Sequence, residues 1–178
     1  MRAAGILAKT LLAVAVLAAA AACGGTASGT SVATGGPATV SGGLTGSVTV
    51  HGAGQYYSGA GAVIGLNGNA SSGLSVLFSL KLPSGTSTVS AGTYTSANVA
   101  DAVILVGQGN VSYAVYGGTN SSNSSPQGSF TLNVTEAGST LSGGGGTQWP
   151  FMHGTLTATL PADSNTAATG TATLSATF

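Results

Sequence analysis

GTATLSATF, at residues 170–178, is the stretch that decides the fold. Small or apolar residues alternate in it with residues that carry hydroxyl groups, and HGTLTATL, at residues 153–160, repeats the scheme. Because successive side chains of a strand point to opposite faces, this period of two predicts β-strands with one buried face and one solvated face. Thr and Ser on the solvated face suit strands and disfavour helices.

The same alternation recurs through the rest of the chain. The inward positions of the four clearest strands are Leu74, Val76, Phe78, Leu80, Leu82, Phe130, Leu132, Val134, Leu156, Ala158, Leu160, Ala172, Leu174, Ala176 and Phe178. Residues 48–50, 63–66, 89–94, 102–106 and 111–116 predict further strands. Asn67-Gly68, Pro83-Ser84-Gly85 and residues 107–110 predict turns between them. No amphipathic helical window of useful length follows residue 23.

Short strands and turns that recur every 8–12 residues or so predict an all-β fold, a single antiparallel β-sandwich. A small β-barrel is the alternative, because the alternating end of the chain with Phe178 resembles the last strand of bacterial outer-membrane barrels. Most of the predicted strands are shorter than the roughly 9–11 residues of a spanning strand. Four Phe, five Tyr and one Trp are also few for two aromatic girdles. The sandwich is favoured.

The amino-terminal segment has the features of an export signal. Arg2 and Lys9 are followed by an apolar run, residues 11–17, that is short for a membrane span. Ala20-Ala21-Ala22-Cys23 resembles a bacterial lipobox, with Ala where that motif prefers Leu. The resemblance implies cleavage before Cys23, the only cysteine, and a diacylglyceryl anchor on its thiol. It places the protein in the bacterial cell envelope.

Three regions follow from this interpretation. Residues 1–22 are the lipoprotein signal peptide, residues 23–43 a lipidated flexible tether, and residues 44–178 the β-sandwich domain. The tether is rich in Gly, Ser and Thr and shows no period. Gly24 stands where inner-membrane retention of such lipoproteins typically requires Asp, so in a Gram-negative host the resemblance implies the outer membrane.

The charge of the chain excludes several classes of partner. Beyond residue 22 the charged side chains are Lys81, Asp101, Glu136 and Asp163, and this part of the chain contains no Arg. A protein that binds nucleic acid needs several basic residues to neutralise phosphates. Binding to an anionic membrane surface needs a polybasic patch. We therefore expect the membrane to be reached only through the lipid, with an envelope protein or a polysaccharide as partner.

The last fifty residues carry a second resemblance. Residues 128–134, 153–160 and 170–178 are similar to a pattern in small secreted bacterial lipoproteins of uncharacterised function. There the pattern comprises a strand, a strand that begins with Gly-Thr, and a closing strand that ends in Phe. The resemblance implies a β-sandwich and carries no known activity.

Candidate catalytic and metal-binding residues are few. His51 and His153 are the only histidines, and each directly precedes a glycine. With Asp101, Glu136 and Asp163 they lack the spacing of a metal motif, and no serine has the strand–helix setting of a nucleophile elbow. Paired carboxylates for a hydrolase are the weakest of the alternatives. We therefore predict no catalytic residue, no metal site and no cofactor.

Two aromatic clusters are the candidate ligand contacts. Trp149 follows four glycines, and Tyr56 and Tyr57 follow Gln55. Exposed aromatic rings beside amides stack on sugars, whereas folded-back rings cap the core. The cap is favoured for Trp149, since a chain with so few aromatic residues needs them in its core. The sequence thus predicts a lipid-anchored, non-enzymatic structural or interaction module of the envelope, with a carbohydrate-binding module as the alternative.

Overall fold

The computed structural model describes residues 35–57, 61–120, 128–137, 141–143, 146–149 and 152–178. The chain divides into two units, Met1–Val32 and Ala33–Phe178, and everything described below belongs to the second. Its described residues form β-strands, turns and irregular segments and contain no helix, which confirms the all-β prediction. The strand pairs within these ranges are all antiparallel.

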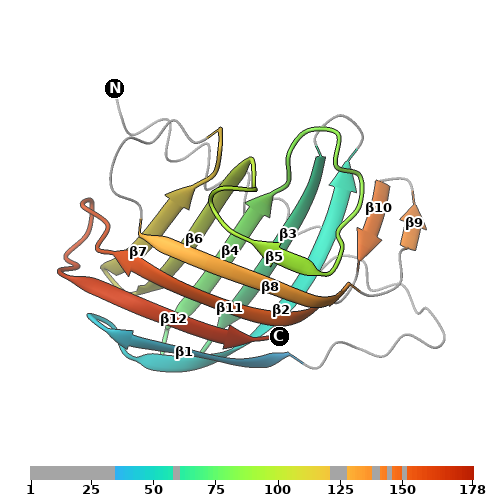
Figure 1. Ribbon diagram of the computed structural model, residues 1–178. Coiled ribbons are helices and arrows are strands. Elements are labelled where there is room, and N and C mark those ends of the chain that lie inside the picture. Colours follow the sequence, from blue (N-terminus) through green and yellow to red (C-terminus); the bar gives the residue numbers. More distant parts are fainter. Residues whose placement is uncertain (1–34, 58–60, 121–127, 138–140, 144–145, 150–151) are drawn as a thin grey trace. The chain divides into compact units, whose positions relative to one another are not determined.

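Twelve strands of the described residues make up the sheet (Figure 1). They are β1 (Gly36–Gly42), β2 (Gly46–Tyr57), β3 (Gly61–Asn69), β4 (Ser75–Lys81), β5 (Gly92–Tyr94), β6 (Asp101–Gln108), β7 (Val111–Gly117), β8 (Ser129–Ala137), β9 (Leu141–Gly143), β10 (Gly146–Trp149), β11 (Met152–Pro161) and β12 (Thr171–Thr177).

The strands follow one path in the order β5-β8-β11-β12-β1-β2-β3-β4-β6-β7, and β10 adds to β2 with β9 beyond it. The sheet curls like half of a barrel, so that β8, β11, β12 and β1 pass across β3, β4 and β6 in Figure 1. The strand β2 makes this possible because its two halves have different partners. Residues 46–50 pair with β1, and residues 51–57 pair with β3.

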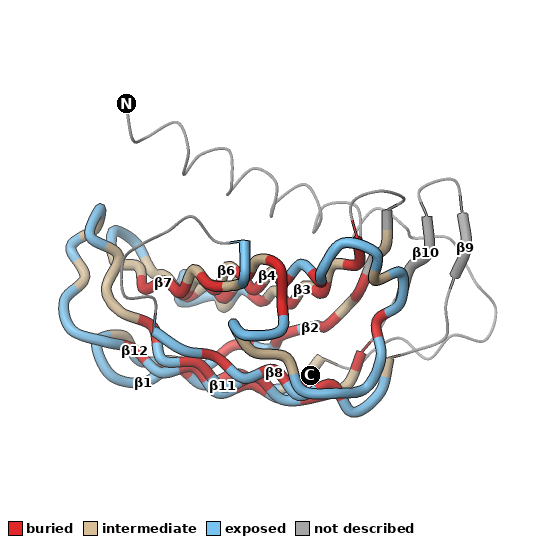
Figure 2. The backbone as a smooth tube through the Cα atoms, turned by 45° about the horizontal axis from the view of Figure 1, so that its top comes forward, coloured by how far each residue is buried: buried red, intermediate tan, exposed pale blue. Residues whose placement is uncertain are grey.

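The core lies inside the curl. Figure 2 shows the buried segments on the inner side of both halves of the sheet. Phe78 of β4 and Phe130 of β8 meet there edge to face, with ring centroids 6.2 Å apart. The inward positions expected from the period of two are all buried, and the alternate positions of β8, β11 and β12 are exposed almost throughout. The predicted faces of these strands are therefore confirmed.

The predicted end of the tether, at residue 43, is wrong. Residues 36–42 lie inside the range 23–43, yet they form β1, which pairs with β12 on one side and β2 on the other. Ala38 and Val40 have no exposed surface. The alternation in this strand includes only two apolar residues, and Gly and Pro precede them. A linker has a similar composition, so the sequence does not distinguish the two. The domain therefore begins before residue 44.

The predicted turn at Asn67-Gly68 is also wrong, because both residues lie within β3. The chain reverses after β3, where Ala70 accepts a hydrogen bond from Gly73 N at 3.0 Å and Gly73 has φ of 82°. A Cβ at Gly68 would collide with the backbone oxygen of Thr49. Glycine is thus required there for a close approach of two strands. The predicted turn at Pro83-Ser84-Gly85 is confirmed. Of the predicted loop at residues 107–110, Gly109 and Asn110 form the turn, whereas residues 107 and 108 end β6.

Candidate functional site: a hydroxyl face on four strands

The outer side of β8, β11, β12 and β1 is covered with hydroxyl groups. We call this surface the hydroxyl face. It comprises Thr39, Ser41, Ser129, Thr131, Thr155, Thr157, Thr159, Thr173, Ser175 and Thr177, all of them exposed. Each of these residues alternates along its strand with a buried apolar residue, so the pattern that builds the core also builds this face.

Strand pairing aligns the hydroxyl groups in transverse rows. One row runs Ser129, Thr159, Thr173, Ser41, and the next runs Thr131, Thr157, Ser175, Thr39. A third row holds Asn133, Thr155 and Thr177. The first two rows cross four consecutive strands and the third crosses three. The register does not shift within them, because the irregularity between β8 and β11 lies at His153/Gly154, beyond the end of the rows.

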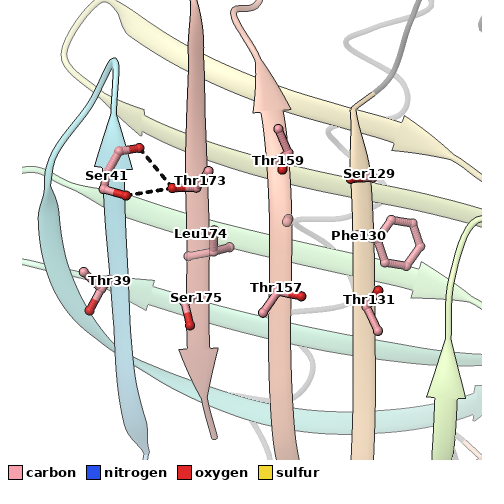
Figure 3. Close-up of a pocket in the computed structure, with 11 residues that line it drawn as sticks. Thr39, Ser41, Ser129, Phe130, Thr131, Thr157, Thr159, Thr173, Leu174 and Ser175 are labelled. Atoms are coloured by element: carbon pink, nitrogen blue, oxygen red, sulfur yellow. Dashed lines mark hydrogen bonds between the residues drawn. The ribbon is translucent and has the colours of Figure 1, made fainter.

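A shallow hollow of about 330 Å³ lies over the first two rows (Figure 3). Its rim is formed by the eight hydroxyl residues of those rows, and Phe130, Ala158 and Leu174 lie between them. The hydroxyls of Ser41 and Thr173 are hydrogen-bonded to each other at 2.7 Å, as one of the two dashed lines of Figure 3 marks. The hydroxyl of Thr173 also donates a hydrogen bond to the backbone oxygen of Ser41 at 3.5 Å.

The hydroxyl face carries no charged residue. Glu136 and His153 lie opposite each other in the register of β8 and β11, past the end of the three rows. Lys81 and Asp101 lie opposite each other in β4 and β6. The face can therefore offer hydrogen-bond donors, acceptors and methyl groups, and it has no ion with which to attract a charged ligand.

The titratable residues singled out from the sequence are distributed over several places. His51 is exposed in β2 opposite Asn67. Asp163 accepts hydrogen bonds from Ser112 Oγ at 3.3 Å and from the backbone and side-chain nitrogens of Asn165 at 3.0 Å. Of these candidates, His153 and Glu136 are placed opposite each other by the register of β11 and β8. No group of three potential metal ligands occurs in the part of the chain that the structure describes.

The phenol of Tyr116 has a shifted pKa. Burial raises the pKa of its phenol above the ordinary value of 10.0, and the negative charge of Asp163 raises it further. Tyr116 belongs to β7, whereas the hydroxyl face is on β8, β11, β12 and β1. This shift therefore reports on the packing around β7 and supplies no acid or base to the hydroxyl face.

The two aromatic clusters expected from the sequence meet in one ladder. The strand β10 pairs with β2 so that Thr147 lies opposite Tyr56, Gln148 opposite Gln55, and Trp149 opposite Gly54. Tyr56 is partly buried against the core. Tyr57 ends β2 opposite Gly61. Cys23, the predicted lipidation site, lies outside the described residues.

The hydroxyl face was not predicted as a site. Its signal is present in the sequence as the shared phase of Ser and Thr in residues 39–41, 129–135, 155–159 and 171–177. The sequence does not reveal that β1, near the start of the domain, lies beside β12, near the end of the domain. That pairing adds β1 to the surface that β8, β11 and β12 form.

Comparison with known protein families, curated proteins and solved structures found no match for this chain. Within the described ranges there is also no helical segment with the length and hydropathy of a membrane span.

Proposed function

We propose that this protein is a lipid-anchored, non-enzymatic module of the bacterial cell envelope, folded as a β-sandwich, that binds its partner through the hydroxyl face. The observation that carries the proposal is the uncharged array of exposed hydroxyl groups on four consecutive strands. Such an array suits adhesion to a neutral surface. It holds no aligned nucleophile, base and orienting group of the kind that catalysis needs.

The packing of the curled sheet supports the sandwich. A single hydrophobic cluster includes residues of both halves, with Phe78 and Phe130 in edge-to-face contact across it. A strand that changes its partners partway, as β2 does, is a common way of joining the two layers of a sandwich.

The anchor is supported by the lipobox-like residues 20–23 and by the charge of the domain. With Lys81 as the only Lys or Arg beyond residue 22, the domain has no polybasic patch for a membrane surface. Two or more acyl chains on Cys23 would give stable attachment, since each buried CH₂ contributes about 0.8 kcal/mol. The start of β1 at Gly36 makes the connection between anchor and domain shorter than the sequence suggested.

Replacement of the cysteine tests the anchor. Cys23→Ser should move the protein from the membrane fraction to the soluble fraction, because the thiol that receives the diacylglyceryl group is lost. Ser28→Ala, a change of similar size nearby, should leave the protein in the membrane fraction. Fractionation of bacteria that express each variant, followed by immunoblotting, gives the answer. A Cys23→Ser protein that stays with the membrane contradicts the anchor.

A carbohydrate-binding module is the second candidate, and the β10–β2 pairing favours it. That ladder brings the backbone of Trp149 within one strand spacing of the segment that holds Tyr56 and Tyr57. Aromatic residues gathered in this way are the usual means of stacking on sugar rings.

Trp149→Ala separates this candidate from the cap that the sequence favours. If Trp149 caps the core, its emission is blue-shifted in the folded protein and Trp149→Ala costs roughly 3–5 kcal/mol in chemical denaturation. If it binds a sugar, its emission is red-shifted, a soluble polysaccharide quenches it, and Trp149→Ala leaves the unfolding midpoint almost unchanged. We expect the first result.

A further inference from the structure

The strand β6, in the half of the sheet opposite the hydroxyl face, has apolar side chains on both of its sides. It reads Ala-Val-Ile-Leu-Val over residues 102–106. Ile104 and its two alternate neighbours are buried in the core, whereas Val103 and Leu105 point away from the core and are partly exposed. A continuous apolar run of this kind is typical of a strand that is covered on both faces.

The strand register joins Val103 and Leu105 to further apolar neighbours. Leu105 lies between Leu77 of β4 and Ala114 of β7, and Val103 lies opposite Tyr116 of β7. We call these five residues the apolar face. Within the described part of the chain, none of them belongs to the hydrophobic core cluster or to the side chains packed against it. The apolar face is therefore left for a partner outside the core.

Charged residues lie at the rim of the apolar face. One row outside it, Lys81 of β4 lies opposite Asp101 of β6. Farther along β7, Ser112 donates a hydrogen bond to Asp163 at 3.3 Å. The ring of Tyr116 is partly buried and ends in a polar hydroxyl, which suits the boundary between hydrocarbon and lipid headgroups. The centre of the face can thus contact an apolar phase while the charges at its rim stay hydrated.

The chain enters the domain at the margin of the same surface. Gly35, the first described residue, lies against His51, since a Cβ on Gly35 would be 2.5 Å from His51 Cε1. His51 begins the row that continues through Asn67 to Leu77 and Leu105. Neighbouring strands are about 4.8 Å apart, so Leu77 on β4 lies roughly 10 Å from the start of this row on β2.

The proposed anchor is close to this entry point along the chain. Eleven residues separate Cys23 from Gly35. A chain of this length spans at most roughly 40 Å. A domain held so near a bilayer meets it at a high effective concentration, so that a contact too weak to bind by itself is populated. An apolar contact also needs no basic residue, so the scarcity of Lys and Arg does not oppose it.

We infer that the apolar face rests on the bilayer that holds the lipid of Cys23, with its side chains among the acyl chains next to the headgroups. This inference rests on the proposed anchor. Figure 2 shows β4, β6 and β7 in one layer of the curled sheet and β8, β11, β12 and β1 in the other. The outer sides of the two layers point away from each other, so the hydroxyl face is turned from the membrane toward a partner.

Quenching of tryptophan fluorescence by brominated lipids tests the inference. Trp149→Phe removes the only tryptophan of the chain, and Leu105→Trp or Thr157→Trp then places one on the apolar face or on the hydroxyl face. The full chain is purified from the membrane fraction of bacteria and reconstituted into phosphatidylcholine vesicles, with or without bromine on the acyl chains near the headgroups. We expect a strong loss of emission for Leu105→Trp and none for Thr157→Trp.

Two lysine variants provide a matched pair of perturbations. Leu77→Lys, beside Leu105, should reduce the quenching of Leu105→Trp because it brings a charge into the apolar face. Thr131→Lys adds the same charge to the hydroxyl face and should leave the quenching unchanged. Circular dichroism verifies that each variant is folded. If Leu105→Trp does not fold, Val103→Trp takes its place, since Val103 points outward from the same strand.

Flotation of the vesicles distinguishes a failure of the anchor from a failure of this inference. A chain that does not float with the vesicles contradicts the anchor at Cys23, and the inference with it. A chain that floats but shows equal quenching at the two tryptophan positions, or quenching that Leu77→Lys leaves unchanged, overturns the inference alone. Emission of Leu105→Trp that is blue-shifted but insensitive to bromine assigns the apolar face to a second copy of the chain instead.

Discussion

Phe178 explains why both histidines are followed by glycine. Its ring is 4% exposed and lies against Gly52 and Gly154. A Cβ at Gly52 would be 2.5 Å from Phe178 Cδ2, and one at Gly154 would be 2.9 Å from Phe178 Cζ. Two hydrogen bonds between the backbones of Gly154 and Phe178, at 3.0 and 3.1 Å, hold the ring there. The glycines that follow the two histidines therefore leave the space that the buried ring of Phe178 occupies.

Gly154→Ala should lower the free energy of unfolding by about 1–3 kcal/mol, because the added methyl group overpacks the space beside the Phe178 ring. It would also meet the backbone oxygen of Asn133, which cannot move aside without disturbing β8. Gly65→Ala is the control, since its Cβ would find Phe78 O at an ordinary 3.7 Å. Urea denaturation should show a clear loss for the first variant and a small change for the second. Equal losses contradict this account.

Tyr116 gives the stability of the protein a dependence on alkaline pH. Burial, and then the charge of Asp163, raise the pKa of its phenol in the folded state above 10.0. The folded state therefore holds the proton more tightly than the unfolded state. This contribution is fully present below pH 10 and is lost as the pH rises through the folded-state pKa.

Urea unfolding measured at a series of pH values up to and beyond 10.0 should show this loss of stability. Tyr116→Phe should remove the part of the loss that comes from this phenol. Asp163→Asn should make the loss smaller but not abolish it, since burial is the larger cause. A Tyr116→Phe protein with the same pH dependence as the wild type contradicts the assignment.

At the scale of elements, β1 is the strand whose role differs most from the sequence-based expectation. Its two inward side chains, Ala38 and Val40, are fully buried between β12 and β2. The buried side chains of β1 are part of the packed core, whereas the side chains of a tether would not be. The free energy of unfolding should therefore respond to substitutions in β1.

Val40→Asp should destabilise the fold by several kcal/mol, because a carboxylate would be buried without a partner. Thr39→Asp, one residue earlier on the exposed side, should change the stability by only about 0.5 kcal/mol. Thermal unfolding of both variants followed by circular dichroism compares them directly. If both are tolerated, residues 36–42 are not part of the core.

The strands with a long, regular alternation could be predicted from the sequence, and the arrangement between strands could not. For β4, β8, β11 and β12 the local pattern alone determines which face is buried. The pairing of β1 with β12 depends on contacts between distant parts of the chain, and so does that of β10 with β2. Asn67-Gly68 was wrongly predicted to be a turn, because Gly68 permits the close approach of its strand to Thr49 and does not reverse the chain. The hydroxyl face needed the strand order before it could be recognised.

For the molecule as a whole, the position of a strand in the path decides how much of the fold depends on it. β12 is paired on both sides, with β11 and β1, whereas β5 pairs with β8 at one end of the path and with no other described strand. A change that removes a backbone hydrogen bond in the interior strand disturbs two neighbours, and the same change in the end strand disturbs at most one.

Thr173→Pro should therefore abolish cooperative unfolding, whereas Thr93→Pro should only lower the midpoint. Thr173 lies between Ser41 and Thr159 in the middle of β12, and Thr93 lies opposite Asn133 in β5. Both sites are exposed, so the comparison isolates the backbone from the core. Urea titrations followed by fluorescence provide the measurement. A cooperative transition in Thr173→Pro would show that β12 is dispensable.

The place of β1 between β2 and β12 also sets the order of events when the chain is made. Ser41 and Thr173, which are hydrogen-bonded in the finished sheet, are 132 residues apart in sequence. A chain delivered with its amino terminus first presents β1 long before the partner that will cover it exists. Until the last strand arrives, one edge of β1 stays open to other chains, a condition that favours aggregation. Timely delivery of the carboxyl end is therefore as much a requirement of this fold as the packing of its core.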